Sequence, residues 1–558
     1  MTLSNKMKIR LLAAAAATLV CCASCVENST RVGQNLIPVG QMYSFHTVDI
    51  PLDDVYVRMA DSLSGFSNSR ITVGAVRDAD YGLSTRNCAL TLIPMVDGEI
   101  DFGKNPKFKS FHFAASKDTT SWPDPSQERI LQSIKVYELS KAIDNIKDYD
   151  CNKPLERSAA TITKGTPVYN GTDSLSFNFN DDFGRKYMTM TTEDLKDIDT
   201  YLAKFPGIMI ESDAPSAEGG RINMFKVQLS FDSNYGYVEG NYAKLSFSGE
   251  YNGERRDSSF LFYYGASDFY DLDSLFTNSS TGKFPQYALN LSSQQTGGKV
   301  GYAEESIDIE GGGGLKPVIS ANWLRDVAER EITRAAQEQG LADVDQALKG
   351  AVINKASLVF PFEMPSDYKS FNYWPAVLSP TCRIKGEEVT SFMGLTDSSS
   401  SSENQGDINR SRLEYSPDIT FHLQEILKID KDDTGNTKTK RLANGDYDIW
   451  LLIMANEIVT TTTQGSSDLS EMYQYLAYQS YYNDMYGYGY GSGGYSNYYS
   501  NYYNYAMLAA YAGSSSTSQS VSTQLDKDRY YKATLNGPQY PDESRRPHLR
   551  LTFALPNE

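Results

Sequence analysis

The chain has little of what catalytic, metal-binding and nucleic-acid-binding proteins use at their sites. It contains four histidines and six cysteines in 558 residues, and its only long apolar run is near its start. The 52 basic residues are outnumbered by 70 acidic ones, which gives a formal net charge of −18. Because an acidic surface repels phosphate backbones, we exclude nucleic acid as a partner.

The cysteines are too few and too scattered for a disulfide scaffold. Three lie in the first 25 residues, and the others are Cys88, Cys151 and Cys382. These three can form at most one disulfide within a chain, and no CxxC pair occurs after residue 25. A hydrophobic core must therefore stabilise the fold.

Catalytic and cofactor motifs are also absent. His46, His112 and His422 each stand beside a phenylalanine in strand-like surroundings, which is typical of structural histidines. The segment Gly311–Gly314 lacks the Gly-Lys-Ser/Thr of a phosphate loop, so we interpret it as a tight crossing or a flexible connection. Residues 430–436 lack the twelfth-position glutamate of a calcium loop, and we interpret them as a hairpin turn. We predict no enzyme activity, catalytic residue, metal site or cofactor.

The first 25 residues have the order of a lipoprotein signal peptide. The basic residues Lys6, Lys8 and Arg10 accompany an apolar segment that ends at Val20. Small residues directly precede Cys25, so we predict that residues 1–24 are removed and that Cys25 carries the lipid. Cleavage without lipid is one alternative. An uncut anchor is another, although the run is shorter than the roughly 20 residues that span a bilayer. Removal of the peptide takes away three positive charges, so the formal net charge becomes −21.

We interpret residues 25–42 as a tether, because 26–40 lack apolar periodicity; these fifteen residues alone reach about 50 Å when extended. The lipid would hold the protein on the outer membrane, at the cell surface or at the periplasmic face. Both faces stay open, because Glu27 alone is acidic immediately after Cys25.

The rest of the chain predicts an all-β fold. Tyrosine is abundant, long amphipathic helices are scarce, and short alternating runs are separated by polar turns. We expect two antiparallel β-sandwich (jelly-roll-like) domains, at 43–240 and 241–558, with one helical insertion and disordered loops. The expected strands are 45–50, 54–59, 133–139, 207–211, 225–230, 244–251, 258–264, 354–362, 418–423, 446–455 and 549–554.

Two local predictions are more specific. Asn252-Gly253 tolerates positive φ angles, which favours a type I′ hairpin turn between the strands 244–251 and 258–264. The apolar residues between 322 and 339 repeat with helical spacing, so we predict a helix that ends at Gly340.

A low-complexity, mobile insertion is predicted over 464–522. The stretch from Tyr473 to Tyr511 contains 15 of the 39 tyrosines, interleaved with glycine, serine and asparagine. Such a tract can stay disordered and still bind, because each phenol offers a flat apolar face and a hydroxyl. We expect it to contact a protein partner; an insertion without a partner is the alternative.

Several motifs, taken in their order, resemble a known family. They are Arg31–Pro38 after the lipobox, Asp78–Ser84 with the pattern D-x-x-aromatic-G, Glu310–Pro317 followed by Ile353–Ala356, and Leu535–Gly537 with Arg546–Leu549. Over nearly the whole mature length, the chain resembles the Bacteroidota lipoprotein family described as domain-of-unknown-function family 4270. The resemblance implies an outer-membrane lipoprotein, and it implies no activity, substrate or catalytic residue.

Four short Asp-Ser/Thr motifs match the pattern used for O-glycosylation in Bacteroidota. The residues that would be modified are Ser62, Thr119, Ser174 and Ser274. A turn or a buried strand edge explains each motif equally well.

Three functions follow from these observations. The first is a non-catalytic, outer-membrane-anchored lipoprotein that acts through protein contacts, as an accessory subunit of an envelope machine for barrel assembly, export or uptake. Its partners would be the membrane, through the N-terminal lipid, and an outer-membrane protein. The second is a surface glycan-binding or adhesion module, in which aromatic side chains stack on a glycan. The third is an envelope hydrolase with a pair of carboxylates, which a sequence does not reveal.

Overall fold

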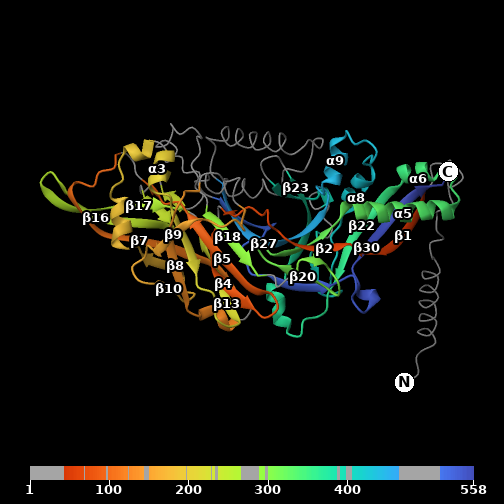
Figure 1. The fold of residues 1–558 in the computed structure, drawn as a ribbon, viewed down its shortest axis with the longest axis horizontal. Helices are drawn as coiled ribbons and strands as arrows, with labels where there is room; N and C mark the ends of the chain where they lie inside the picture. Colours follow the sequence, from red (N-terminus) through yellow and green to blue (C-terminus); the bar gives the residue numbers. More distant parts are fainter. Residues whose placement is uncertain are drawn as a thin grey trace, which may run out of the picture. The chain divides into compact units, whose positions relative to one another are not determined.

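A computed structural model gives the fold (Figure 1). It describes residues 43–67, 70–95, 99–122, 125–143, 150–196, 198–227, 229–232, 237–264, 288–295, 299–385, 390–397, 405–463 and 516–557. The predicted signal peptide, Cys25, the tether, Ser274 and residues 464–515 of the predicted insertion lie outside the described residues.

The described residues form an antiparallel, all-β architecture, which confirms the predicted fold class. Within them, α5 (Ala321–Gln339) is the only α-helix longer than eight residues. It coincides with the predicted helix, and Gly340 follows it with a φ of +75°, as expected for a glycine that ends a helix.

The chain divides into two compact units. The first contains Met1–Val48, Ala328–Asn354 and Thr552–Glu558, and the second contains Asp49–Val327 and Lys355–Leu551. In the first unit, the imidazole of His46 stacks on the ring of Phe553, with 5.3 Å between their centroids. Both candidate sites described below lie in the second unit.

The largest sheet of the second unit has 14 strands. Its core is aromatic: Phe111, Phe113 and Phe179 are fully or almost fully buried, and their rings pack against one another and their neighbours. The strand order is β10 (Val168–Tyr169), β8 (Gln132–Leu139), β12 (Ile208–Ser212), β5 (Gly82–Leu90), β4 (Arg70–Asp78), β13 (Gly219–Lys226), β7 (Lys104–Ser121), β16 (Tyr242–Tyr251), β17 (Glu254–Tyr263) and β6 (Ile93–Met95). Off this path, β11 (Ser174–Asn178) pairs with β7, β9 (Arg157–Thr161) pairs with β8, and β18 (Ala288–Gln294) pairs with β5 and β3 (Phe66–Ser67).

The other sheets are smaller. One has the order β19 (Gly301–Tyr302), β2 (Val55–Met59), β21 (Leu315–Ile319), β27 (Ile449–Thr463), β23 (Val377–Lys385) and β24 (Thr390–Gly394), with β28 (Ser516–Leu525) paired to β27. Another has the order β1 (Tyr43–Pro51), β30 (His548–Pro556), β22 (Val352–Pro361), β26 (Glu414–Tyr415) and β25 (Ile408–Asn409). The two-stranded pairs are β14 (Leu229–Asp232) with β15 (Tyr237–Gly240), and β20 (Ser306–Glu310) with β29 (Lys532–Asn536).

The predicted hairpin is confirmed. Strands β16 and β17 pair from Tyr242↔Tyr263 to Tyr251↔Glu254, and the turn residues Asn252 and Gly253 have φ angles of +53° and +86°. Two positive φ angles in succession define the type I′ turn that matches the twist of the strands. Residue 240, where the sequence places a domain boundary, lies just before β16, and β16 pairs with β7 in the largest sheet.

The strand predicted at 418–423 is wrong, because these residues lead into helix α8 (Thr420–Leu427). Ile419, Leu423 and Ile426 have helical spacing, and all three are buried. Residues 430–436 form the turn between α8 and α9 (Thr437–Ala443), so the predicted hairpin turn at this point is also wrong. Asn436 caps α9, since its side chain accepts a hydrogen bond from the backbone N–H of Lys438.

Candidate functional site

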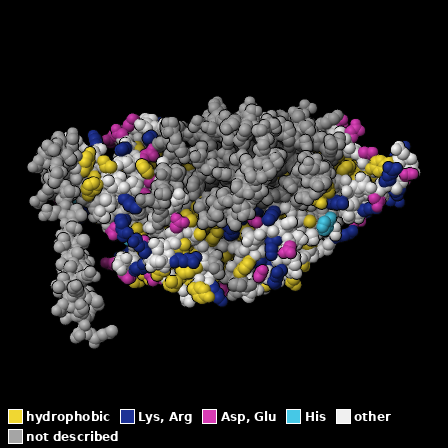
Figure 2. Space-filling view, turned by 180° about the vertical axis from the view of Figure 1, so that it is seen from behind, with side chains coloured by type: hydrophobic (Ala, Val, Ile, Leu, Met, Phe, Trp, Pro, Cys, Tyr) yellow, Lys and Arg dark blue, Asp and Glu magenta, His cyan; other side chains and the backbone are white. Residues whose placement is uncertain are grey.

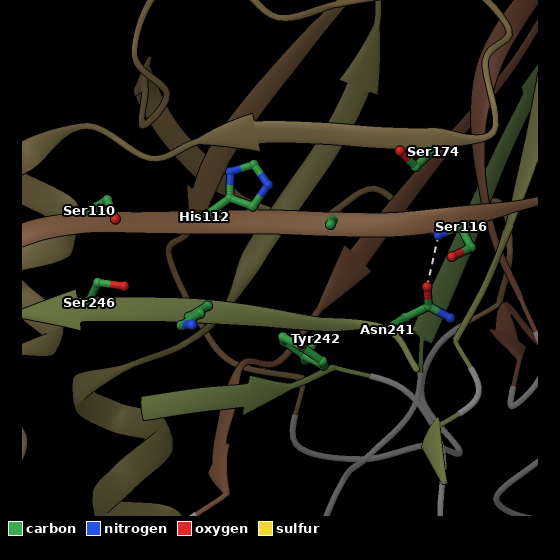
Figure 3. Close-up of a pocket in the computed structure, with 9 residues that line it drawn as sticks. Ser110, His112, Ser116, Ser174, Asn241, Tyr242 and Ser246 are labelled. Atoms are coloured by element: carbon green, nitrogen blue, oxygen red, sulfur yellow. Dashed lines mark hydrogen bonds between the residues drawn. The ribbon is translucent and has the colours of Figure 1, made fainter. Parts of the chain in front are cut away.

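A polar groove lies on one face of strands β7, β11 and β16 (Figure 3). It is half open to solvent, with a volume of about 400 Å³. We call this feature the polar groove; its lining residues are Ser110, His112, Ala114, Ser116, Ser174, Asn241, Tyr242, Lys244 and Ser246.

Strict alternation along each strand creates the groove. On β7, Phe111 and Phe113 are fully buried, while His112 between them is only half-buried. On β16, Leu245 is fully buried, while Lys244 before it is exposed. Since neighbouring side chains of a strand point to opposite faces, the aromatic core fills one side of the sheet and short polar side chains cover the other.

The strand register places the groove residues in rows. His112 pairs with Lys244 of β16 on one side and with Asn178 of β11 on the other. The His112 Nδ1 atom lies 3.1 Å from the Asn178 Oδ1 atom, which is a hydrogen-bonding distance. The next pair along the antiparallel strands is Ala243 with Phe113, and Tyr242 and Ala114, which follow these two residues outward, both line the groove.

The end of the groove is held by a backbone contact. Asn241 is buried, and its Oδ1 atom accepts a hydrogen bond of 2.8 Å from the backbone N–H of Ser116 (Figure 3). This contact fixes the start of β16 against β7, directly beside Tyr242. The position of the phenol is thus set by the sheet.

The groove differs in charge from the chain as a whole. Acidic residues outnumber basic ones in the sequence, but the described residues of the groove lining include one lysine, one histidine and no aspartate or glutamate. On the face shown in Figure 2, acidic and basic side chains of the described residues are interspersed. Lys244, which is exposed, therefore gives the described lining a positive charge.

A second feature is a ribbon formed by β27 and β28. The two strands pair over ten residues, from Met454↔Leu525 to Thr463↔Ser516. At its base, Trp450 and Leu452 are buried and pack with Phe392 in one hydrophobic cluster. Beyond Ala455, β28 is the only described strand that pairs with β27. We call residues 455–463 and 516–524 the ribbon.

The chain that follows the ribbon is held to the core by charged and polar contacts. We call the residues that make them the anchor cluster; they are Asp78, Tyr81, Asp308, Tyr530 and Lys532. Both carboxylate oxygens of Asp78 accept hydrogen bonds of 2.9 Å from the Lys532 ammonium, and one also accepts from the Tyr530 hydroxyl at 3.1 Å. The Tyr81 hydroxyl donates to the Asp308 carboxylate at 2.7 Å. Burial raises the pKa of Asp78, but the contacts with Lys532, together with the hydrogen bonds from the backbone N–H groups of Asp80 and Tyr81, outweigh this effect and hold the pKa below its usual value.

One motif of the family resemblance, Asp78–Ser84, takes part in this cluster, and a second, Leu535–Gly537, begins in β29, the strand that it contacts. Asp78 and Tyr81 belong to the turn between β4 and β5, and the Tyr81 hydroxyl lies 2.8 Å from the backbone oxygen of Ala533 in β29. Gly82 ends the turn with a φ of +74°. A third motif, Glu310–Pro317, leaves β20, the partner strand of β29.

The Gly311–Gly314 turn is a tight crossing, which confirms one of the two interpretations from the sequence. A Cβ atom on Gly311 would lie 2.5 Å from the backbone oxygen of Arg529, and one on Gly313 would lie 2.0 Å from the Asn152 Oδ1 atom. The ammonium of Lys316, which is buried below the turn, donates to the backbone oxygens of Glu310, Gly312 and Gly314. Burial lowers the pKa of Lys316 to about 7.

The histidines are spread over the fold. Only His112 lines the groove, whereas His422 is buried and its Nε2 atom lies 2.9 Å from the backbone oxygen of Tyr447. Burial lowers the pKa of His422 to about 4. His548 lies beside Arg550, with 3.2 Å between its Nε2 atom and a guanidinium nitrogen.

The predicted modification sites have different surroundings. Ser62 is buried and bonds to the guanidinium of Arg383, Thr119 is half-buried in β7, and Ser174 is exposed at the start of β11, where it lines the groove. Modification at these three residues stays a prediction.

The described cysteines, Cys88, Cys151 and Cys382, are all buried and free. In the described ranges, no three histidine, cysteine or acidic side chains come together in a way that could hold a metal ion. Within the same part of the chain, no helix has both the length and the apolar character that a membrane crossing requires.

Comparisons with family models, curated proteins and solved structures gave no match for this chain. The resemblance to the Bacteroidota lipoprotein family stays a prediction. The groove itself was missed from the sequence. Alternation in residues 110–116 and 242–246 signals its two main strands, but nothing in the sequence signals that β7, β11 and β16 are neighbours.

Proposed function

We propose that this protein is a non-catalytic lipoprotein of the outer membrane that acts through protein contacts, with the tyrosine-rich stretch Tyr473–Tyr511 as its contact segment. It would serve as an accessory subunit of an envelope machine for barrel assembly, export or uptake. The observation that carries the proposal is the ribbon, because its ladder pairs Thr463 with Ser516, the two described residues between which that segment lies in the sequence.

The ribbon gives the segment a defined point of attachment. Nine residues of β27, from 455 to 463, extend the ladder by about 30 Å at 3.3 Å per residue. The base of the ribbon is fixed by the buried Trp450 and by Lys527, whose ammonium donates to the backbone oxygens of Ser64 and Phe66 at 2.5 Å. A force that a partner exerts on the contact segment would therefore be transmitted through the ribbon to the core of the second unit.

The composition of the segment supports a role in binding. Tyrosine is enriched at protein interfaces, because one side chain supplies a large apolar face and a hydrogen-bonding hydroxyl with few rotatable bonds. The signal peptide and Cys25 would place this surface in the envelope, where an outer-membrane protein is the expected partner. The family resemblance, in which no activity is implied, agrees with a binding role.

The register provides a precise deletion. Because Thr463 and Ser516 face each other in an antiparallel ladder, an Asn-Gly turn can replace residues 464–515 and close the ribbon as a two-residue hairpin. We expect the deletion variant to fold and to reach the membrane, but to lose the outer-membrane protein that co-purifies with the wild type after crosslinking in intact cells. Quantitative mass spectrometry of the crosslinked complexes is the measurement.

Two further variants separate the segment from the anchor. Replacing the 15 tyrosines of Tyr473–Tyr511 by serine keeps the length and should lose the partner as the deletion does. Cys25→Ala should lose fatty-acid labelling and membrane retention while the ribbon is unchanged. An unaltered set of crosslinked proteins in both segment variants contradicts the contact role, and an unlabelled wild type contradicts the lipid anchor.

A further inference from the structure

The polar groove is a second surface, separate from the tyrosine-rich segment. Its nine lining side chains come from β7, β11, β16 and the residue before β16, and their positions are set by the sheet (Figure 3). Ser116, Ser174 and Lys244 are exposed, while the opposite face of the same strands is the aromatic core. The groove is therefore a rigid surface, and its volume of about 400 Å³ falls within the usual range of small-molecule sites.

We propose that the polar groove binds an acidic saccharide, and that the Lys244 ammonium pairs with the carboxylate of a uronic acid unit. The proposal is independent of the tyrosine-rich contact segment, because the polar groove lies in the largest sheet and the ribbon belongs to another sheet.

The neutral part of the lining fits a sugar. Four serine hydroxyls, at positions 110, 116, 174 and 246, can each donate and accept a hydrogen bond, as a pyranose hydroxyl does. Tyr242 and Ala114 both line the groove, so an aromatic ring stands among the small and polar side chains of the lining. A pyranose has an apolar C–H face, and an aromatic ring next to polar groups matches that combination.

The charged part of the lining selects among sugars. Lys244 and His112 face each other across β16 and β7, and the lining residues that the structure describes include no carboxylate. A free anion would satisfy Lys244 alone, whereas a uronic acid unit would also use the serine hydroxyls and the Tyr242 ring. A charge-assisted hydrogen bond to a carboxylate is shorter and stronger than a neutral one, so it should dominate the preference.

The test uses the full mature protein, purified in detergent, and titration calorimetry with two matched ligands. The first is an oligosaccharide of glucuronic acid, and the second is the same oligosaccharide after reduction of its carboxylates to neutral alcohols. We expect the acidic ligand to bind about tenfold more tightly than the neutral one. Binding of neither ligand at millimolar concentration overturns the proposal, as does equal affinity for the two.

Variants of the lining give a second readout. Lys244→Gln should remove the tenfold preference without changing the thermal midpoint, because Lys244 is exposed. Lys107→Gln is the control, since Lys107 is exposed on β7, the strand that pairs with β16, but is not among the lining residues. Tyr242→Ala should weaken both ligands, and Tyr242→Phe should restore binding. Equal losses in the two lysine variants would show a general effect of charge and overturn the site.

A competition experiment distinguishes a sugar site from a simple anion site. Inorganic phosphate should displace the acidic oligosaccharide only at concentrations far above that of free glucuronate. Equal competition by phosphate and glucuronate would mean that Lys244 binds any anion, and it would overturn recognition of the sugar. The deletion of 464–515 removes none of the groove residues, so we expect the deletion variant to bind the saccharide as the wild type does. This result would distinguish the saccharide proposal from the contact role of the tyrosine-rich segment.

Discussion

Asp78 in the anchor cluster offers the sharpest test of the forces that hold the second unit together. Its side chain is 8% exposed and accepts hydrogen bonds from the backbone N–H groups of Asp80 and Tyr81 as well as from Lys532 and Tyr530. Asp78→Asn keeps the shape and an acceptor for the backbone, but it removes the charge and turns an amide toward an ammonium. The variant therefore isolates the ionic contact.

The magnitude follows from burial. Breaking a fully buried ion pair by changing one partner costs about 3–5 kcal/mol. The Lys532 side chain is 24% exposed, so water screens part of the interaction, and we expect Asp78→Asn to lower the free energy of unfolding by about 2–3 kcal/mol. In the double variant with Lys532→Met, the loss of unfolding free energy should be smaller than the sum of the two single losses by at least about 1 kcal/mol, because both changes remove the same contact.

The dependence on pH has a definite sign. The pKa of Asp78 in the folded protein lies below its ordinary 3.8, so the stabilisation is complete above that value and is lost as the pH falls through the folded pKa. Although burial lowers the pKa of Lys532, its contacts with Asp78 raise it overall, so its share is complete below the ordinary 10.5 and is lost only at higher pH. The difference between wild type and Asp78→Asn should be constant from about pH 5 to 9 and shrink below about pH 4.

Urea denaturation followed by tryptophan fluorescence measures these differences, with Asp257→Asn as the matched control. The Asp257 carboxylate also pairs with a lysine in the largest sheet, at 2.5 Å from Lys109, but its side chain is 73% exposed. The control should change the free energy of unfolding by less than about 0.5 kcal/mol. If Asp78→Asn were as mild as the control, or if its effect were unchanged at pH 3, the argument from burial would be refuted.

Three further changes follow from backbone space and burial, and denaturation curves check each. Gly311→Ala should lower the free energy of unfolding by about 1–3 kcal/mol, because its Cβ would lie 2.5 Å from the Arg529 backbone oxygen. The control is Gly350→Ala, whose Cβ would have no atom nearer than 3.8 Å and which should leave the free energy unchanged or raise it by up to about 1 kcal/mol. Equal effects of the two changes would contradict the close approach at Gly311. Gly253→Ala should cost about 1 kcal/mol through its φ of +86° alone, since no atom lies within 4 Å, and a neutral result would argue against the type I′ turn. The free energy of unfolding should fall by up to about 3 kcal/mol between pH 6.5 and 4, because His422 binds a proton in this range in the unfolded chain but stays neutral when it is buried in the folded protein. His422→Gln should flatten this pH dependence. An unchanged dependence would assign it to other groups.

The elements that the sequence predicted correctly are those whose signals are local. The Asn252-Gly253 turn needs only two residues that tolerate positive φ, and α5 needs only a repeat of apolar side chains over five turns. The strand prediction at 418–423 failed because six residues are too few to separate a strand from one and a half turns of helix. Leu423 and Ile426, with the buried Ile419, decide in favour of the helix only once their common burial is seen.

The candidate site was harder to predict for a different reason. His112 was noticed for the phenylalanines beside it, and that pattern correctly indicated a strand with its aromatic residues in the core. Its partners Asn178 and Lys244 are 66 and 132 positions away in the numbering, and only the pairing of β11 and β16 with β7 brings them together. No pattern along the chain encodes that proximity.

Alternation and turn chemistry act between near neighbours in the chain, so they were enough to predict the fold class, the hairpin and the long helix. Which strands share a sheet became known only from the folded protein, and with it the place of Lys244 in the polar groove and the contact between Asp78 and Lys532. Strand pairing depends on backbone hydrogen bonds, for which every residue carries a C=O acceptor and every residue except proline an N–H donor, so the choice of partner is set by the packing of the whole core.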